Sequence, residues 1–173
     1  MHPIYSVFFM KAHKVLHLFL LACLLAACSS PRYSAQRKGY QSTDRDRERV
    51  IAYAYQQIGT PYQYAGSAPG GFDCAGFVQY VFRKAGYSLP RSTIAQSQTG
   101  RKISKHNLRP GDLVFFKGSN KRQSKVGHVG IVVEKYRNNS FRFIHAANRG
   151  VAESRSEETY WKERYLQARK VFR

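Results

Sequence analysis

The sequence has 173 residues, a length that suits one domain and leaves little room for a second. It carries 29 Lys and Arg against 10 Asp and Glu, for a formal net charge of +19. This charge favours a polyanionic environment, such as a bacterial envelope or nucleic acid, although a solvated surface explains it equally well. The three cysteines have no regular spacing, which argues against a disulfide framework.

The first 27 residues have the pattern of an export signal. Lys11 and Lys14 form a positive region, and residues 15–27 are an apolar run that is too short to span a bilayer comfortably. Either Met1 or Met10 can be the start. We therefore expect a signal peptide over residues 1–27.

Leu25-Ala26-Ala27-Cys28 resembles a bacterial lipobox, in which the signal is cut before a cysteine that becomes acylated. The resemblance implies lipidation of Cys28, with palmitate-like chains that provide stable anchoring. Ser29 in the next position indicates sorting to the outer membrane, so we expect the periplasmic face of that membrane. The alternative is a plain secretory signal that leaves Cys28 unmodified.

Residues 28–43 are polar, basic and poor in aliphatic side chains, and we expect a flexible tether there. The folded domain is then expected over residues 44–173. Its first helix is indicated by apolar residues at helical spacing from Val50 to Ile58, and Gly59 ends it.

A second helix is expected to begin at Cys74, because a glycine-rich loop precedes it and apolar residues recur at helical spacing from Phe77 to Ala85. At a helix N-terminus the free N–H groups and the dipole favour a thiolate. The alternative is a small buried cysteine. A short helix should follow, capped by Ser92 or Thr93, with Gln96 completing a capping box.

The rest of the chain has the pattern of strands, over residues 113–116, 126–134, 140–146 and 165–172. Helices come first and strands second, without alternation. This order predicts an α+β fold with an antiparallel sheet.

His128 and His145 lie on two of these strands. If Asn138-Asn139 forms the hairpin turn, His145 pairs with Val132 and the two histidines share one face. They would then be four residues apart, about 13 Å, and a bulge or a shifted turn would be needed for contact.

If the histidines do meet near Cys74, the three side chains can supply a nucleophile, a base and an orienting group. A Cys-His-His zinc site is the competing interpretation, although the sequence has no convincing metal-ligand spacing.

With these residues assembled, the chain from about Arg49 to Phe172 resembles the NlpC/P60 family of cell-wall peptidases. The resemblance implies a papain-like fold in which N-terminal helices pack on a C-terminal antiparallel sheet. The matching stretches are Gly59-Thr60-Pro61-Tyr62-Gln63-Tyr64, Gly71-Phe72-Asp73-Cys74, Leu89-Pro90-Arg91, Arg109 to Phe116, Gly127-His128-Val129-Gly130-Ile131 and Phe143-Ile144-His145-Ala146.

The same resemblance implies the role of each site residue. The nucleophile would be Cys74, the base His128, the orienting residue His145 and the hydroxyl near the oxyanion Tyr62. Asp73 would either cap the helix or contact the substrate amine. The chain departs from the family at Ala75, where serine is usual, which removes a hydroxyl but leaves the main-chain donor.

The resemblance also implies a thiol protease that hydrolyses peptide bonds of peptidoglycan stems or cross-links through a Cys thiolate and an acyl-enzyme. We expect no cofactor and no metal. The expected partners are peptidoglycan stem peptides and a membrane reached through the lipid anchor, with no nucleic acid and a monomeric chain. The alternatives are a non-catalytic peptidoglycan-binding lipoprotein and an amidase or acyltransferase of related fold.

Overall fold

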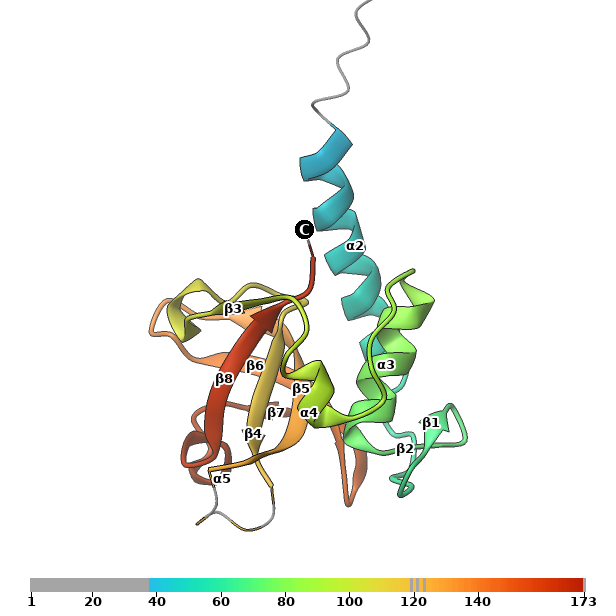
Figure 1. Ribbon diagram of the computed structural model, residues 1–173, viewed down its shortest axis with the longest axis vertical. Helices are drawn as coiled ribbons and strands as arrows, with labels where there is room; N and C mark the ends of the chain where they lie inside the picture. The colour runs from blue at the N-terminus through green and yellow to red at the C-terminus, as the bar shows by residue number, and fades with distance from the viewer. Residues whose placement is uncertain (1–37, 119, 121, 123, 173) are drawn as a thin grey trace, which may run out of the picture. The chain divides into compact units, whose positions relative to one another are not determined.

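The structure, a computed structural model, describes residues 38–118, 120, 122 and 124–172 (Figure 1). The expected signal peptide, Cys28 and most of the tether lie outside the described residues. The elements, in chain order, are α2 (Lys38–Tyr55), β1 (Ser67–Ala68), β2 (Gly71–Phe72), α3 (Cys74–Lys84), α4 (Thr93–Gln96), β3 (Arg101–Ile103), the 3-10 helix η2 (Lys105–Asn107), β4 (Leu113–Lys117), β5 (Val126–Lys135), β6 (Phe141–Ala147), β7 (Gly150–Arg155), α5 (Thr159–Lys162) and β8 (Tyr165–Lys170).

Helix α2 begins earlier than the sequence suggested. The helix includes residues 38–43, which we expected in the flexible tether. Residues 38–43 have no apolar periodicity and include Gly39, a poor helix former, so no helix was expected there. Further along α2, Arg49 pairs with Asp46 one turn away. In the described part of the chain, no helix is long and apolar enough to cross a membrane.

The larger sheet has six strands in the order β3-β8-β4-β5-β6-β7, and all neighbours are antiparallel. The predicted α+β class and the four predicted strands are confirmed. Strands β3 and β7 were not expected, because Arg-Lys-Ile and Gly-Val-Ala-Glu-Ser-Arg lack clear apolar alternation. Their pairing with β8 and β6 holds them in the sheet.

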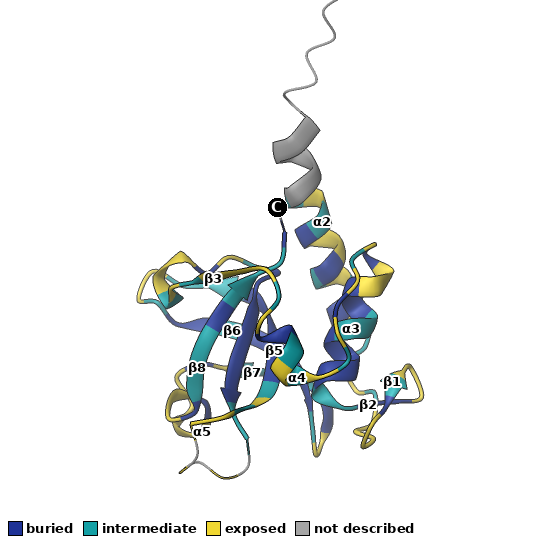
Figure 2. Ribbon diagram, viewed as in Figure 1, coloured by how far each residue is buried: buried dark blue, intermediate teal, exposed yellow. Residues whose placement is uncertain are grey.

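Both faces of the sheet are covered, which explains the continuous apolar run of β4. Leu113 and Phe115 belong to one core together with α2 and α3. Val114 and Phe116 belong to a second core on the other face, where Trp161 of α5 packs. Figure 2 shows β4 mostly dark blue, whereas β8 beside it is mostly teal.

The short helix α4 is capped by Ser92, whose hydroxyl accepts from the Ala95 N–H. The predicted capping box with Gln96 is wrong. The Gln96 side chain is fully buried and donates to the carbonyls of Ala75 and Pro90, so it joins α3 to α4 instead.

Candidate active site

Cys74 is the first residue of α3, as the sequence predicted. The preceding Asp73 caps the helix with its carboxylate, which accepts from the Gly76 N–H at 2.7 Å. The Cys74 sulfur lies 3.5 Å from the Thr93 hydroxyl, and the backbone N–H of Val129 is directed at it. The thiol is therefore held between the start of α3, the start of α4 and β5.

Burial raises the pKa of the Cys74 thiol above its ordinary value. The nearby Asp73 carboxylate raises it further, while hydrogen bonds from Thr93 and from the Val129 and Ala75 N–H groups act in the opposite direction. Since the net shift is upward, the expectation that the helix N-terminus alone would stabilise a thiolate is not met in the free protein. Desolvation outweighs the helix-end donors.

The register between β5 and β6 differs from the prediction. Ile131 pairs with Ile144 and Val132 with Phe143, but the register shifts by one residue between Val132 and Glu134. Extending the inner register sets His145 opposite Gly130, so the histidines are offset by two residues and not by four. The turn contributes one residue of this change, because Lys135 pairs with Phe141 where the prediction paired residues 135 and 142, and the bulge contributes the other.

Gly130 lies between the two histidines along this face, and it has to be a glycine. A Cβ atom there would be 2.6 Å from Cδ2 of Phe143 and 3.3 Å from Cβ of His145. The empty position lets the two imidazoles meet diagonally across the strands.

The histidines form a hydrogen-bonded line that ends at a serine. Nε2 of His128 is 3.0 Å from Nδ1 of His145, and Nε2 of His145 is 3.1 Å from the Ser154 hydroxyl. If His145 donates to Ser154, its Nδ1 must accept from His128. The tautomer of His128 that results has a free lone pair on Nδ1, which is the form that a general base needs.

Both histidines are desolvated. Burial lowers the pKa of His128 from 6.5 to about 3, and the neighbouring His145 contributes further. Burial also lowers the pKa of His145 to about 4. Trp161 stacks on His128 with ring centroids 5.2 Å apart and meets His145 edge to face at 4.7 Å. The pair is therefore neutral at physiological pH.

Cys74 and His128 lie on neighbouring elements, since α3 and α4 both contact β5. The pairing of β5 with β6 ends at Ile131 and Ile144, so the start of β5 is open to α3 and α4. The residue after His128 is Val129, whose N–H is directed at the sulfur. The hydrogen-bond partner of the thiol is Thr93 and not a histidine.

Tyr62 lines a cavity of about 430 Å³ together with Cys74. Its side chain is 39% exposed, which argues against simple packing under the loop. Burial raises the pKa of Tyr62, and the Cys74 thiol, when ionised, would raise it further, which places the phenol within electrostatic reach of the sulfur. Tyr62 is held there by a bridge to Phe72, two residues before Cys74.

Asp73 is fully engaged by the protein itself. Besides its cap to Gly76, it accepts from Arg91 at Oδ1 (2.9 Å) and at Oδ2 (2.5 Å). Arg91 also donates to the Gly66 carbonyl at 3.3 Å. This bidentate pair ties the Cys74 loop to the segment before α4, so of the two predicted roles for Asp73, capping is the one that the structure supports.

The described residues contain no group of three or more His, Cys, Asp or Glu side chains that could hold a metal ion. The zinc alternative therefore gains no support from the site geometry.

Several residues at this site were not singled out from the sequence. Arg91 lay inside a matching stretch and had no assigned role, while Thr93 was considered only as a helix cap. Ser154 and Trp161 come from segments with no distinct motif. The one signal for Gly130 was its place in Gly127-His128-Val129-Gly130.

Comparison with known proteins places this site in a family. The family model for the NlpC/P60 family matches residues 59–170, a range that contains Cys74, His128 and His145. The chain belongs to the NlpC/P60 family. The predicted fold and resemblance are thereby confirmed.

Two relatives from Escherichia coli K12 illustrate this NlpC/P60 relationship. One, "Murein DD-endopeptidase MepS/Murein LD-carboxypeptidase", is 47% identical over 128 residues, which are 72% of this chain and 63% of that protein. The chain thus matches less than two thirds of that relative's length. The other, "Probable endopeptidase NlpC", is 38% identical over 160 residues, which are 89% of this chain and 97% of that protein.

A solved structure of the same family also resembles this chain. The Staphylococcus aureus Mu50 protein "similar to lipoprotein, NLP/P60 family" superposes with a TM-score of 0.66 at 32% identity, over 75% of this chain and 42% of that one.

Proposed function

We propose that this chain is a cysteine peptidase that hydrolyses peptide bonds in peptidoglycan stems or cross-links. Cys74 is the nucleophile, His128 the general base and His145 the residue that orients it. The observation that carries the proposal is the hydrogen-bonded line from Ser154 through His145 to His128, which ends one residue from the N–H directed at the Cys74 sulfur. The name of the murein endopeptidase relative supports the substrate class, and the names of both relatives support an endopeptidase.

The chemistry follows from a neutral thiol and a neutral imidazole. Because burial keeps both groups uncharged, the Cys74 proton moves to Nδ1 of His128 as the sulfur attacks the scissile carbonyl carbon. The imidazolium then gives that proton to the leaving amine, and a thioester remains on Cys74. Water, deprotonated by His128, attacks the thioester, releases the carboxylate product and restores the thiol.

The oxyanion formed in each attack needs donors. The Tyr62 hydroxyl shares the cavity with the sulfur, and the backbone N–H groups at the start of α3 are unused by the helix. Tyr62 and one of these N–H groups can therefore stabilise the tetrahedral intermediate.

We further propose that Cys28 carries the lipid anchor and holds the enzyme at the periplasmic face of the outer membrane. The lipobox-like Leu25-Ala26-Ala27-Cys28 and the following Ser29 support this assignment. Metabolic labelling with a palmitate analogue should mark the wild type and leave Cys28→Ala unlabelled. Labelling of the Cys28→Ala variant would remove the assignment.

The activity is tested by incubating the purified protein with disaccharide-peptide monomers and cross-linked dimers and identifying the products by mass spectrometry. Conversion of dimers to monomers indicates an endopeptidase, and loss of the terminal residue from tetrapeptide monomers indicates a carboxypeptidase. Either product, absent with Cys74→Ser, supports the proposal. Intact substrates at every pH, with Cys74→Ser indistinguishable from wild type, would instead favour a non-catalytic binding protein.

A further inference from the structure

A second cavity lies away from Cys74, between α2, β3 and β8. Its volume is about 360 Å³. Five cationic side chains line it, with one acid, Asp112, and the Ser104 hydroxyl. The five cations are Arg47, Arg101, Lys102, Arg109 and Lys170.

The acids near this cavity are already used. Asp112 is 1% exposed and pairs with Arg47 at 2.9 Å, while Arg109 pairs with Asp44 at 3.0 Å. Within the described ranges, no carboxylate forms an ion pair with Arg101, Lys102 or Lys170. Among the described residues, Arg101 and Lys102 are thus left without a paired acid, whereas Lys170 lies within electrostatic reach of Asp112.

Arg47 forms the buried wall of the cavity. It is 5% exposed, its Nη1 donates to the Pro110 carbonyl, and its guanidinium stacks on Phe172 at 4.6 Å. Its Nη2 has no hydrogen-bond partner among the residues that the structure describes. A buried, unsatisfied guanidinium N–H is costly, and an anion or an anion-held water next to it would remove that cost.

The hydrogen-bond donors that line this cavity suit a tetrahedral oxyanion. β3 is an edge strand, paired with β8 alone, and its residues Arg101 and Lys102 are both exposed. Ser104 follows this strand and does not cap the turn that begins at Lys105. Guanidinium, ammonium and hydroxyl donors converging on one cavity can satisfy the several oxygens of a phosphate group.

We propose that this cavity binds a phosphate group, such as that of an anionic lipid headgroup. Lys38, the first residue of α2, is ten residues from Cys28. A fully extended chain of ten residues spans about 35 Å. An anchored domain therefore has membrane headgroups within reach, and binding would fix the face that it turns to the membrane. The cavity and its charges do not depend on the peptidase activity.

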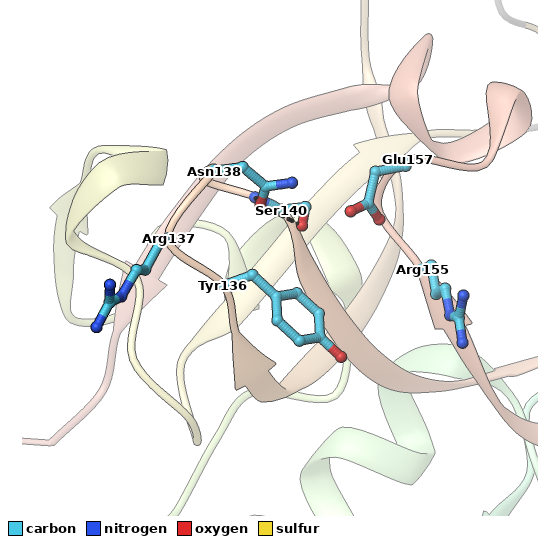
Figure 3. Close-up of a pocket in the computed structure, with 6 residues that line it drawn as sticks. All are labelled: Tyr136, Arg137, Asn138, Ser140, Arg155 and Glu157. Atoms are coloured by element: carbon cyan, nitrogen blue, oxygen red, sulfur yellow. Dashed lines mark hydrogen bonds between the residues drawn. The ribbon is translucent and has the colours of Figure 1, made fainter.

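A further cavity of the domain, at the turn between β5 and β6, supplies a control position. It is larger, about 480 Å³, but Glu157 lines it beside the cations, and Arg137 extends away from Tyr136 and Glu157 (Figure 3). Arg137 and Arg149 are exposed, so replacing them removes the same charge as replacing Arg101 and Lys102.

The test is a backbone-amide NMR titration of the full chain at constant ionic strength. The probes are inorganic phosphate, dihexanoylphosphatidylglycerol and dihexanoylphosphatidylcholine, with each lipid kept below its micelle concentration. We expect saturable shifts of residues 101–104 and 170 with at least one of the first two probes. Arg101→Gln/Lys102→Gln should weaken this binding at least tenfold, and Arg137→Gln/Arg149→Gln should leave it unchanged.

Binding of phosphatidylglycerol in preference to phosphatidylcholine would identify the source as a lipid headgroup, whereas binding of inorganic phosphate alone would identify a soluble phosphate. The proposal is overturned if no probe gives saturable shifts there, or if both double variants lose binding equally. Muropeptide cleavage should be unaffected by Arg101→Gln/Lys102→Gln, so failure of this site is distinguishable from failure of the proposed function.

Discussion

Nδ1 of His145 lies 3.0 Å from Nε2 of His128, and the far nitrogen of His145 meets the Ser154 hydroxyl at 3.1 Å. The Ser154 hydroxyl fixes the tautomer of both rings only if it accepts a hydrogen bond from the Nε2–H of His145. Ser154 is thus a positioning residue that acts through the two histidines.

Ser154→Ala should lower kcat by roughly tenfold, the equivalent of one hydrogen bond of about 1.4 kcal/mol, and leave KM unchanged. Ser154→Thr should restore much of the rate, because it keeps the hydroxyl. Steady-state kinetics on a cross-linked muropeptide, with nitrogen-15 NMR of the imidazoles to read the tautomers, makes the comparison. An unchanged kcat with an unchanged tautomer would exclude the role.

The neutral thiol predicts how Cys74 reacts with an alkylating agent. Since burial raises its pKa, the iodoacetamide rate at Cys74 should keep rising from about pH 6 to beyond about pH 9. Thr93→Val removes the hydroxyl 3.5 Å from the sulfur and should move the profile to still higher pH, while Thr93→Ser should not. Peptide mapping assigns the adduct to Cys74. A plateau already reached at neutral pH would show a preformed thiolate-imidazolium pair.

The desolvated histidines predict loss of stability in acid. Their pKa values are about 3 and about 4 when folded, against an ordinary value of 6.5, so between these limits the unfolded chain binds more protons. Their contribution is complete above about pH 6.5 and declines as the pH falls toward 3. His128→Gln/His145→Gln should therefore flatten the dependence of Tm on pH over this window. A double variant whose Tm falls as steeply as that of the wild type would contradict the shifts.

Replacing Gly130 should cause a steric clash at the centre of the site. Gly130→Ala should destabilise the fold by about 1–3 kcal/mol, because Phe143 and His145 must move away from the new Cβ atom. Gly70→Ala is the matched control, since a Cβ atom there meets nothing within 4 Å. Chemical denaturation measures both. Equal stabilities of the two variants would refute the assigned crowding at Gly130.

The sequence predicted the elements that carry an apolar pattern. The start of α3 at Cys74 and the strands around His128 and His145 follow from helical spacing and apolar runs. Strands β3 and β7 do not, because partners distant in sequence hold them in place. Residues 38–43 of α2 were missed because they have no apolar residues at helical spacing.

The site was predictable in its residue types but not in its geometry. The turn register and one bulge between Val132 and Glu134 together decide whether the histidines meet, and an apolar run such as Ile131-Val132-Val133 does not record which residue is the extra one. The direction of the Cys74 pKa shift likewise depends on burial in three dimensions. Neither Thr93 nor Ser154 stands in a pattern that marks its contact with the reacting groups.

The central claim is that Cys74 forms the acyl-enzyme. Acid quenching of the wild type during turnover of a cross-linked muropeptide, followed by intact-mass and peptide-mapping mass spectrometry, addresses it directly. We predict an acyl adduct on Cys74 in the wild type, and for Cys74→Ala no adduct and a cleavage rate at least about 1000-fold lower with an unchanged circular dichroism spectrum. An adduct on another residue, or cleavage by Cys74→Ala at the wild-type rate, would contradict it.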